Sequence, residues 1–390
     1  MEEKEIGLYI HIPFCKQKCY YCDFVSFSNK KRMVKRYVMC IENEIKKVAH
    51  ENKILAEHGL EPVYVLKTIY IGGGTPSVIN EMYIGELLNT VKNSFMQKNE
   101  IEVTIEVNPG TVTKENLKKY FEYGVNRLSI GLQATQNRLL KEIGRIHTYE
   151  EFELTYKNAR DVGFKNINVD LMIGLPNQSI EDVKESTRKI LKLKPEHISV
   201  YSLIVEENTK MEELVLKKKV VLPEDKIERE MYWYVKNELE KKKYCHYEIS
   251  NFAKRGFESK HNTDCWNQNE YIGVGTAACS FLNNARYGNT ENLEEYIQNI
   301  ENNTPSKNII LQEILDEESK MNEYMMLSLR KIDGVSISEF KKRFNKNPIM
   351  KYSKTLKKLI DENLIQIDKD RIMLSKKGID LANLVWEEFI

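Results

Sequence analysis

Short apolar runs alternate with polar segments along the first 210 residues of the chain. Six of these runs are rich in Ile, Val, Leu and Tyr, and they span residues 6–12, 68–73, 102–108, 126–133, 166–174 and 197–204. Such runs are typical of parallel strands that are buried on both faces. The segments between them carry apolar residues at helical spacing. Six strand–helix units in succession predict a right-handed parallel α/β sheet.

The residues that end these strands indicate which kind of parallel sheet to expect. Distinctive residues follow one strand after another, at "GGGTPS" (72–77), "EVNPG" (106–110), Gln133, Asp170 and Tyr201. Functional residues contributed by many strand ends are typical of a β/α barrel, whereas a doubly wound sheet gathers them at one switch point. We therefore expect residues 1–210 to form a partial (β/α)6 barrel similar to a TIM barrel.

The alternation changes after residue 210, and two further regions are expected. Residues 211–310 mix helical segments with a stretch rich in Gly and Asn, and should extend the barrel. Residues 311–390 indicate helix, turn, helix, a further helix, two short strands around a "DKD" turn and a last helix. That order predicts a mostly helical, winged-helix-like C-terminal domain.

The charge balance restricts the possible partners. The 390 residues include 59 basic and 58 acidic side chains, for a net charge of +1, so no overall field attracts nucleic acid or an anionic membrane. Basic residues at 341–346 would suit DNA binding, but equally many acids favour a packing or lid role. No apolar run approaches the roughly 20 residues that cross a bilayer, and the N-terminus lacks a signal-peptide layout. We expect a soluble cytoplasmic protein with no transmembrane segment and no nucleic-acid partner.

Three of the seven cysteines, Cys15, Cys19 and Cys22, follow the first predicted strand directly. A reducing cytosol disfavours disulfides, so this cluster indicates metal binding or catalysis. A zinc site needs a fourth ligand, and only His11, in an alternating strand, lies near. Three thiolates on a four-iron cluster account for the count better, because the fourth iron then keeps an open coordination position.

The C-x3-C-x2-C spacing at the first strand–helix loop resembles that of the radical S-adenosylmethionine (SAM) superfamily. The resemblance implies a [4Fe-4S] cluster whose open iron chelates SAM. It also implies reductive cleavage of SAM to a 5′-deoxyadenosyl radical, with an electron donor such as flavodoxin or ferredoxin. "GGGTPS" matches the superfamily's loop for the methionine amino group. Consecutive glycines also let the backbone approach a ligand closely, and the "GK[ST]" of a phosphate loop is missing.

Further motifs narrow the resemblance to the coproporphyrinogen dehydrogenase-like group. "YIHIPFC", "GVNRLSIGLQ", "GRIHT", "VDLMIGLP", "HISVYSL" and "HYEISNFAK" occur in that group's order, over nearly the whole chain. Carried over by position, the residues that should line the SAM site are Tyr9, Gly73, Gly74, Thr75 and Glu106. Three further residues, Gln133, Arg145 and Asp170, match positions that contact SAM, or a second SAM molecule, in the oxidase branch of the group.

Two branches share this framework. The oxidative decarboxylases have a fourth cysteine two residues after the third, and an extension ahead of the cluster. Here Phe24 stands at the cysteine position, and only eight residues precede Tyr9. Both departures favour the heme-chaperone branch, HemW, which resembles the enzymes but passes heme to acceptor proteins, respiratory ones among them, and lacks the dehydrogenase activity.

The heme motif of that branch, H-N-x-x-Y-W, is similar to "HNTDCW", in which His261, Asn262 and Trp266 agree and Cys265 replaces Tyr. Imidazole and thiolate are both heme-iron ligands. We expect His261, in a polar Gly-rich loop, to present its ring to the macrocycle with Trp266 stacked beside it. Cys279 replaces a histidine that is usual in the group, and Cys265 or Cys279 is expected to adjust axial ligation or form a thiol–heme link.

Three functions stay open at this point. The favoured one is a heme chaperone that binds heme and a [4Fe-4S] cluster with exchangeable SAM, and transfers heme to acceptor proteins. The second is a radical SAM enzyme acting on a tetrapyrrole, such as an oxygen-independent coproporphyrinogen III dehydrogenase, because the two cysteine replacements weaken the heme signature. The third, a nucleic-acid-binding protein with a structural metal, is disfavoured by the charge balance.

Overall fold

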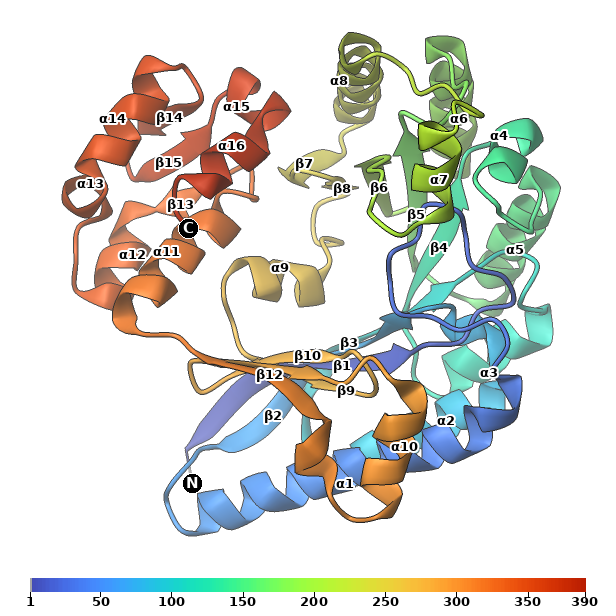
Figure 1. The fold of residues 1–390 in the computed structure, drawn as a ribbon, viewed down its shortest axis with the longest axis vertical. Helices are drawn as coiled ribbons and strands as arrows, with labels where there is room; N and C mark the ends of the chain where they lie inside the picture. Colours follow the sequence, from blue (N-terminus) through green and yellow to red (C-terminus); the bar gives the residue numbers. More distant parts are fainter. Residues whose placement is uncertain (1) are drawn as a thin grey trace.

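A curved 12-stranded sheet forms the main body of the protein (Figure 1), whose structure, a computed structural model, describes residues 2–390. The strand order is β12-β11-β10-β9-β1-β2-β3-β4-β5-β6-β8-β7. Its central strands are parallel and consecutive: β1 (Glu3–Ile12), β2 (Val63–Gly73), β3 (Met96–Val107), β4 (Arg127–Gln133), β5 (Asn166–Ile173) and β6 (His197–Ser202). The predicted six-stranded parallel sheet is confirmed.

Helices link successive parallel strands and cover one face of the sheet (Figure 1). They are α1 (Val34–Glu57), α2 (Glu81–Ser94), α3 (Lys114–Glu122), α4 (Asn137–Glu142), α5 (Tyr149–Val162) and α6 (Ile180–Leu193). Side chains of Thr113, Thr148 and Ser179 cap the N-termini of α3, α5 and α6 in capping boxes, which satisfy backbone N–H groups that a helix leaves free. The apolar stripe of α2 is buried against the sheet as its spacing predicts.

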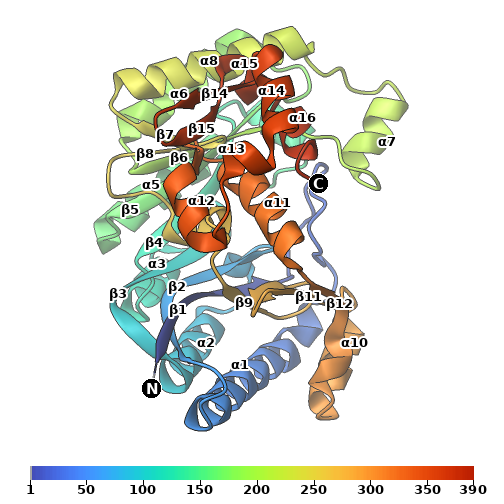
Figure 2. The same ribbon diagram turned by 90° about the vertical axis from the view of Figure 1, so that its left-hand side faces the viewer.

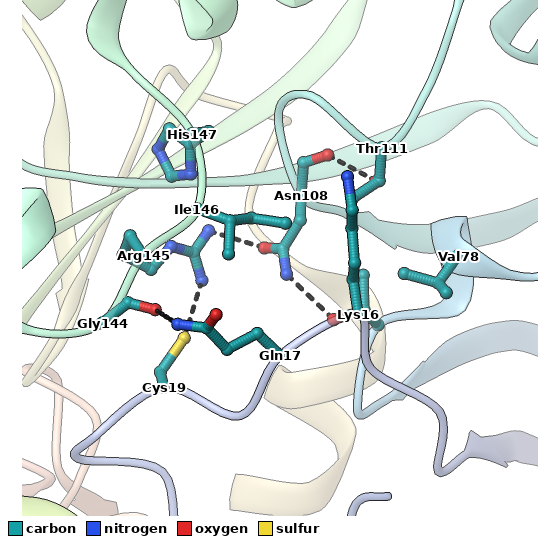
Figure 3. Close-up of a pocket in the computed structure, with 11 residues that line it drawn as sticks. Lys16, Gln17, Cys19, Val78, Asn108, Thr111, Gly144, Arg145, Ile146 and His147 are labelled. Carbon is teal, nitrogen blue, oxygen red and sulfur yellow. Dashed lines mark hydrogen bonds between the residues drawn. The ribbon is translucent and has the colours of Figure 1, made fainter. Parts of the chain in front are cut away.

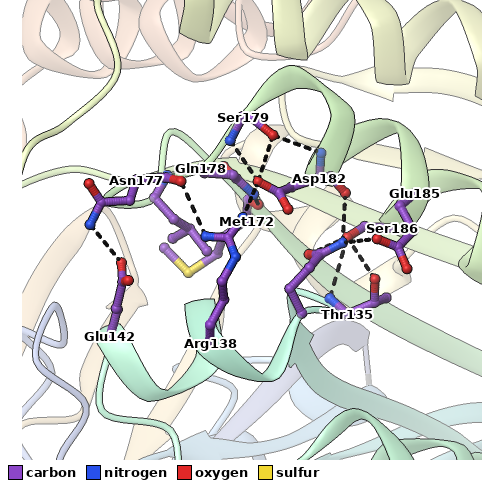
Figure 4. Close-up of polar contacts among 12 residues, drawn as sticks. Thr135, Arg138, Glu142, Met172, Asn177, Gln178, Ser179, Asp182, Glu185 and Ser186 are labelled. Carbon is purple, nitrogen blue, oxygen red and sulfur yellow. Dashed lines mark hydrogen bonds and ion pairs between the residues drawn. The ribbon is translucent and has the colours of Figure 1, made fainter.

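Polar contacts tie α4 and the loop after β5 to α6 (Figure 4). Arg138 of α4 donates to Asp182 Oδ2 at 2.5 Å and to the carbonyl of Asn177 at 3.2 Å. The backbone N–H of Thr135 donates to Ser186 Oγ at 3.3 Å. These contacts fix the chain just beyond the C-terminal ends of β4 and β5, where two of the expected site residues lie.

Residues 203–314 extend the sheet at both edges with strands that the sequence did not predict. β7 (Cys245–Glu248) and β8 (Asn251–Ala253) add to β6, while β9 (Tyr271–Val274), β10 (Cys279–Leu282), β11 (Ala285–Asn289) and β12 (Ile309–Ile314) add to β1. The helices here are α7 (Lys210–Leu216), α8 (Asp225–Lys241), α9 (Lys260–Trp266) and α10 (Leu293–Glu301). These strands are short, and they owe their stability to pairing with the edges of the parallel sheet.

The C-terminal residues form a separate layer with its own apolar core (Figures 1 and 2). Its helices are α11 (Glu317–Ser328), α12 (Ile337–Phe344), α13 (Pro348–Lys351), α14 (Ser353–Asp361), α15 (Lys376–Asp380) and α16 (Ala382–Glu387), and its strands are β13 (Val335–Ser336), β14 (Ile365–Asp368) and β15 (Arg371–Leu374). The structure contains the expected pair of strands around the "DKD" turn. Within residues 2–390, every helix is too short or too polar to cross a bilayer.

Candidate functional site

A cavity of about 420 Å³ opens at the C-terminal ends of the parallel strands. Its wall is built by the loops after those strands, as a β/α barrel requires. Ten residues that the sequence analysis assigned to the cluster or to SAM line it: Cys15, Cys19, Cys22, Gly73, Gly74, Thr75, Glu106, Gln133, Arg145 and Asp170. Side chains that are separated by as many as 155 positions in the chain therefore share one cavity.

The three thiols lie on the loop after β1 and have polar neighbours in the cavity wall. The Thr75 hydroxyl donates to Cys15 Sγ at 3.5 Å, and Arg145 Nη1 donates to Cys19 Sγ at 3.6 Å. Burial raises the pKa of the Cys15 thiol, and burial together with the neighbouring thiols raises the pKa of Cys22 to about 11. Iron would have to displace those protons, because the thiolate is the ligand. In the described chain no three His, Cys, Asp or Glu side chains are arranged to hold a single metal ion.

The glycines of "GGGTPS" let the loop after β2 pack directly onto the cysteine loop. Gly73 has a φ of 113°, and a Cβ there would lie 2.6 Å from the His11 ring. A Cβ on Gly74 would lie 3.1 Å from Cys15 Sγ. The first distance is shorter than real Cβ contacts and the second is tighter than most of them, so glycine at both positions favours this close approach.

Glu106 is a half-buried carboxylate in the wall of the cavity. It accepts hydrogen bonds from the Tyr70 hydroxyl at 2.9 Å and from the backbone N–H of Gly73 at 3.2 Å. Burial raises its pKa to about 7, and burial also raises the pKa of Asp170, which accepts a hydrogen bond from Asn168 at 2.7 Å. Two carboxylates in such surroundings suit a ligand with a cationic group, because that group would offset the burial cost.

Arg145 connects the cysteine loop to the strands β3 and β4 (Figure 3). Its Nη2 donates to Asn108 Oδ1 and to the carbonyl of Gly131, each at 2.6 Å, while Asn108 Nδ2 donates to Thr75 Oγ1 at 2.9 Å. A void of about 10 Å³ beside this network has room for about one water molecule. Sequence reasoning missed the role of Asn108, although it lies within the "EVNPG" motif.

Tyr9 lies one layer away from the cavity wall. Its hydroxyl is 2.9 Å from His11 Nδ1, and its ring centroid is 6.2 Å from that of Tyr70, which lines the cavity. The other nitrogen of His11 is 3.0 Å from the carbonyl of Val25, so both ring nitrogens have partners within the protein. Tyr70 was also missed by sequence reasoning, although its alternation with Thr68 places both on one face of β2.

The heme-motif residues lie apart from the cavity, on α9. The expectation of a Gly-rich loop is wrong, because residues 260–266 form a helix whose first N–H groups are satisfied by Ser259 and by the buried carboxylate of Glu102. His261 is only 6% exposed. Its Nδ1 lies 2.8 Å from Thr68 Oγ1, and its ring centroid is 5.3 Å from that of Tyr70. Burial lowers the pKa of His261 to about 4, so its ring is neutral at pH 7.

Trp266 does not stack beside His261, because five residues along a helix turn the two side chains about 140° apart. Its ring centroid instead lies 4.4 Å from the Arg330 guanidinium, which is also 4.5 Å from the ring of Trp386. This contact joins α9 to the C-terminal domain. The backbone N–H of Asn262 donates to Ser259 Oγ at 3.4 Å, which is part of the helix cap.

Further cations from the C-terminal domain hold the end of α9. Arg343 donates to the carbonyls of Asn267 and Gln268 at 3.0 and 2.9 Å, and Lys331 donates to the Asn267 side chain. Cations are favoured at the C-terminal end of a helix, where carbonyls lack partners. The expected packing role of the basic residues near 343 is consistent with these contacts.

The two extra cysteines lie in different surroundings. Cys265 is half-buried on α9, and desolvation raises its pKa to about 12. Cys279 is exposed on β10, although partial burial of its sulfur raises its pKa as well. Both thiols are therefore protonated at neutral pH.

The comparisons with known proteins agree along the whole chain. The Radical SAM superfamily model matches residues 9–190, and the HemN C-terminal domain model matches residues 315–381. The chain is 35% identical to the heme chaperone HemW of Lactococcus lactis subsp. lactis (strain IL1403), covering 100% of the chain and 98% of the relative. It is 36% identical to HemW of Bacillus subtilis (strain 168), covering 98% of each.

A solved structure shows the same fold. The structure of coproporphyrinogen III oxidase (HemN) from Escherichia coli, described as a radical SAM enzyme, superposes with a TM-score of 0.84. The match covers 99% of this chain and 90% of that one, at 21% identity. The expected radical SAM barrel with its C-terminal domain is confirmed at the level of fold.

Proposed function

Because the chain belongs to the HemW family of the radical SAM superfamily, we propose that it is a heme chaperone that transfers heme to acceptor proteins. In this proposal the protein also holds a [4Fe-4S] cluster with exchangeable SAM. The main support for the proposal is that the candidate cluster and SAM site is separate from the candidate heme ligand. The cysteines, the glycine loop and Glu106 share one cavity, while the motif residue His261 lies outside it on α9.

The cavity residues fit the cluster and SAM. Cys15, Cys19 and Cys22 hold the cluster, which supplies an open iron for the amino-acid part of SAM and one electron. The backbone of Gly73 and the carboxylate of Glu106 accept the SAM amino group. Arg145 keeps a positive charge beside the Cys19 sulfur, at 3.6 Å, and so stabilises the thiolate that the iron requires.

The segment around His261 can bind heme only after α9 has moved. His261 is neutral, so one nitrogen of its ring keeps a lone pair for iron. A planar macrocycle, however, cannot reach a ring that is 6% exposed. Heme loading therefore displaces α9 from the barrel, and the contacts of α9 with Thr68 and Arg330 are those that must break.

The proposed function also requires an electron donor and heme acceptors. Exposed Lys16 and Lys18 beside the thiols suit an acidic electron donor such as flavodoxin or ferredoxin. Heme acceptors include respiratory heme proteins. Free thiols of this kind persist in a reducing compartment such as the cytoplasm.

Heme titration of the full-length, anaerobically reconstituted protein tests the proposal. The parent should bind one equivalent of heme, as seen in the difference spectrum near the Soret band, and His261→Ala should abolish that binding. His50→Ala, which removes an exposed histidine of α1, is the matched control and should bind heme as the parent does. Unchanged stoichiometric binding by His261→Ala would reject the assignment of the heme ligand.

A second function is favoured by one specific observation. The cavity that holds the cysteines also contains two half-buried carboxylates and the exposed ring of Tyr201 at its mouth, so it has room for chemistry on a bound tetrapyrrole. Incubation with SAM, a reductant and coproporphyrinogen III distinguishes the two functions. A decarboxylated product would favour the enzyme, and stoichiometric heme binding without that product favours the chaperone.

A further inference from the structure

Arg127 at the start of β4 is a buried cation without the partners that such a group needs. It is 2% exposed and belongs to the largest fully buried side chains of the protein. Its Nε has no hydrogen-bond partner within residues 2–390. A buried charge costs several kcal/mol unless other groups compensate it. The motif "GVNRLSIGLQ" contains this arginine, but neither the cluster nor the heme motif accounts for it.

The sheet register places Arg127 in a row of unsatisfied polar atoms beneath the cavity. Thr104 on β3 and Asn166 on β5 are its direct neighbours in register. Thr104 Oγ1 and Asn166 Oδ1 are also buried without partners in the described chain. Residues two apart on a strand face the same side, and Ser129, two residues after Arg127, lines the cavity. The guanidinium therefore lies one layer below the cavity floor.

The cavity carboxylates lie on the two neighbouring strands, above this row. Glu106 follows Thr104 by two residues on β3, and Asp170 follows Asn166 by four on β5, so both share the inward face with Arg127. Burial raises the pKa of both carboxyl groups, and the charge of Arg127 acts in the opposite direction on each. The cation and the two carboxylates thus offset one another's burial cost.

Apart from Arg127 and Asp170, the ionisable groups that face Glu106 are tyrosines; Arg145, another cation of the cavity, acts on Asp170. The tyrosines are Tyr9 on β1, Tyr70 on β2 and Tyr201 on β6, and burial raises the pKa of each above its ordinary value. They are neutral at physiological pH and cannot replace a cation. Asp170 adds a negative charge, which opposes ionisation of Glu106.

We propose that Arg127 is a positioning residue of the SAM site, whose buried guanidinium, one layer below the cavity floor on the face that Glu106 occupies, favours the ionised form of Glu106 that accepts a hydrogen bond from the amino group of SAM. The inference rests on the proposed cluster and SAM site and adds a residue that touches neither ligand. Arg127 acts through Glu106, and removing its charge shifts the pH at which SAM binds.

SAM affinity measured against pH tests the inference. The reconstituted full-length protein is titrated with SAM between pH 6 and 9.5, and binding is followed by the change in the EPR signal of the reduced cluster. In the parent, binding should strengthen as pH rises through about 7, where Glu106 loses its proton. In Arg127→Met the midpoint should rise by about one pH unit, with an affinity about fivefold lower at pH 7 that recovers as pH rises past the new midpoint. Arg127→Lys should restore the parent profile.

Two results would overturn the inference. Arg127→Met with an unchanged midpoint would show that the charge does not reach Glu106, and a loss of affinity by the same factor at every pH would show a structural role only. Arg127→Gln provides a second variant if Arg127→Met does not fold, and its midpoint should also rise because the same positive charge is removed. An unmoved midpoint there would also reject the inference. A parent protein that binds no SAM at any pH would instead reject the proposed SAM site.

Discussion

Replacing Arg330 by methionine should tighten heme binding, because this side chain fastens α9 to the C-terminal domain. Its guanidinium lies 4.4 Å from the ring of Trp266 and 4.5 Å from that of Trp386. Arg330 also acts on the carboxylate of Glu248. Burial raises the pKa of that carboxylate, and the positive charge of Arg330 lowers it. Methionine has a similar length and remains apolar, so Arg330→Met removes the cation without opening a large cavity.

The expected magnitude follows from the two aromatic contacts. A cation–π contact contributes about 1 to 2 kcal/mol when the cation is largely desolvated, and methionine regains part of the packing. Arg330→Met should therefore destabilise the closed position of α9 by about 2 kcal/mol in total. If heme binds only after α9 has moved, the cost of opening falls by that amount, and the apparent Kd for heme should fall by about 30-fold.

The assay is heme titration of the full-length protein by difference absorbance, together with amide hydrogen exchange at α9. Arg330→Met should show both tighter heme binding and faster exchange at α9, since the helix opens more often. Arg32→Met, which removes an exposed arginine far from α9, should leave both unchanged. Arg330→Lys should lie between the parent and Arg330→Met, because lysine retains the charge but not the planar face.

Weaker or unchanged heme binding by Arg330→Met would refute the reasoning. Weaker binding would mean that Trp266 needs its present position to receive heme. Unchanged heme binding, together with faster amide exchange at α9, would mean that heme binding does not require α9 to leave the barrel.

Three further outcomes follow from the cavity. Glu106→Gln should weaken SAM binding about 10- to 100-fold, since a charge-assisted hydrogen bond is lost, and should flatten its dependence on pH; a pH dependence that persists in a titration of this variant would contradict the assignment. Cluster assembly at limiting iron should improve between pH 7 and 9, because the raised pKa of Cys22 leaves protons that iron must displace; acid-labile sulfide measures this, and a flat profile would count against it. Gly73→Ala should lower the free energy of unfolding by about 2 kcal/mol or more, because the added Cβ would meet the His11 ring at 2.6 Å in a left-handed conformation; denaturant unfolding of the variant would show whether that strain exists.

Local patterns were sufficient to predict the parallel sheet and the cavity. Each parallel strand is a short apolar run, and most site residues of the cavity lie at the end of such a run or directly after it, whereas Arg145 lies beyond α4. Parallel strands necessarily bring their C-terminal ends together, so the cysteines, the glycine loop and Asp170 could be placed in one region without coordinates. The edge strands β9 to β12 could not be predicted, because each has only four to six residues and depends on pairing in a row that begins at β1.

The heme-motif segment shows the limit of that reasoning most clearly. The sequence indicated a loop in which His261 and Trp266 lie together. The structure forms a helix, because Ser259 and Glu102 satisfy its first N–H groups and the side chains of His261 and Trp266 find separate partners on β2 and in the C-terminal domain. Glu102 lies 159 positions from His261 along the chain, and no local pattern reports such a contact.

The sequence alone determined the six strand–helix units, the three-thiol loop and the glycine loop, because each depends on the spacing of neighbouring residues. Only the tertiary structure decided that His261 is withdrawn into the barrel, that Arg330 lies against two tryptophans, and that Arg127 is buried beneath the cavity carboxylates. Those arrangements depend on charges and hydrogen bonds between segments far apart in the chain, and their free energies exist only once the sheet has brought the segments together.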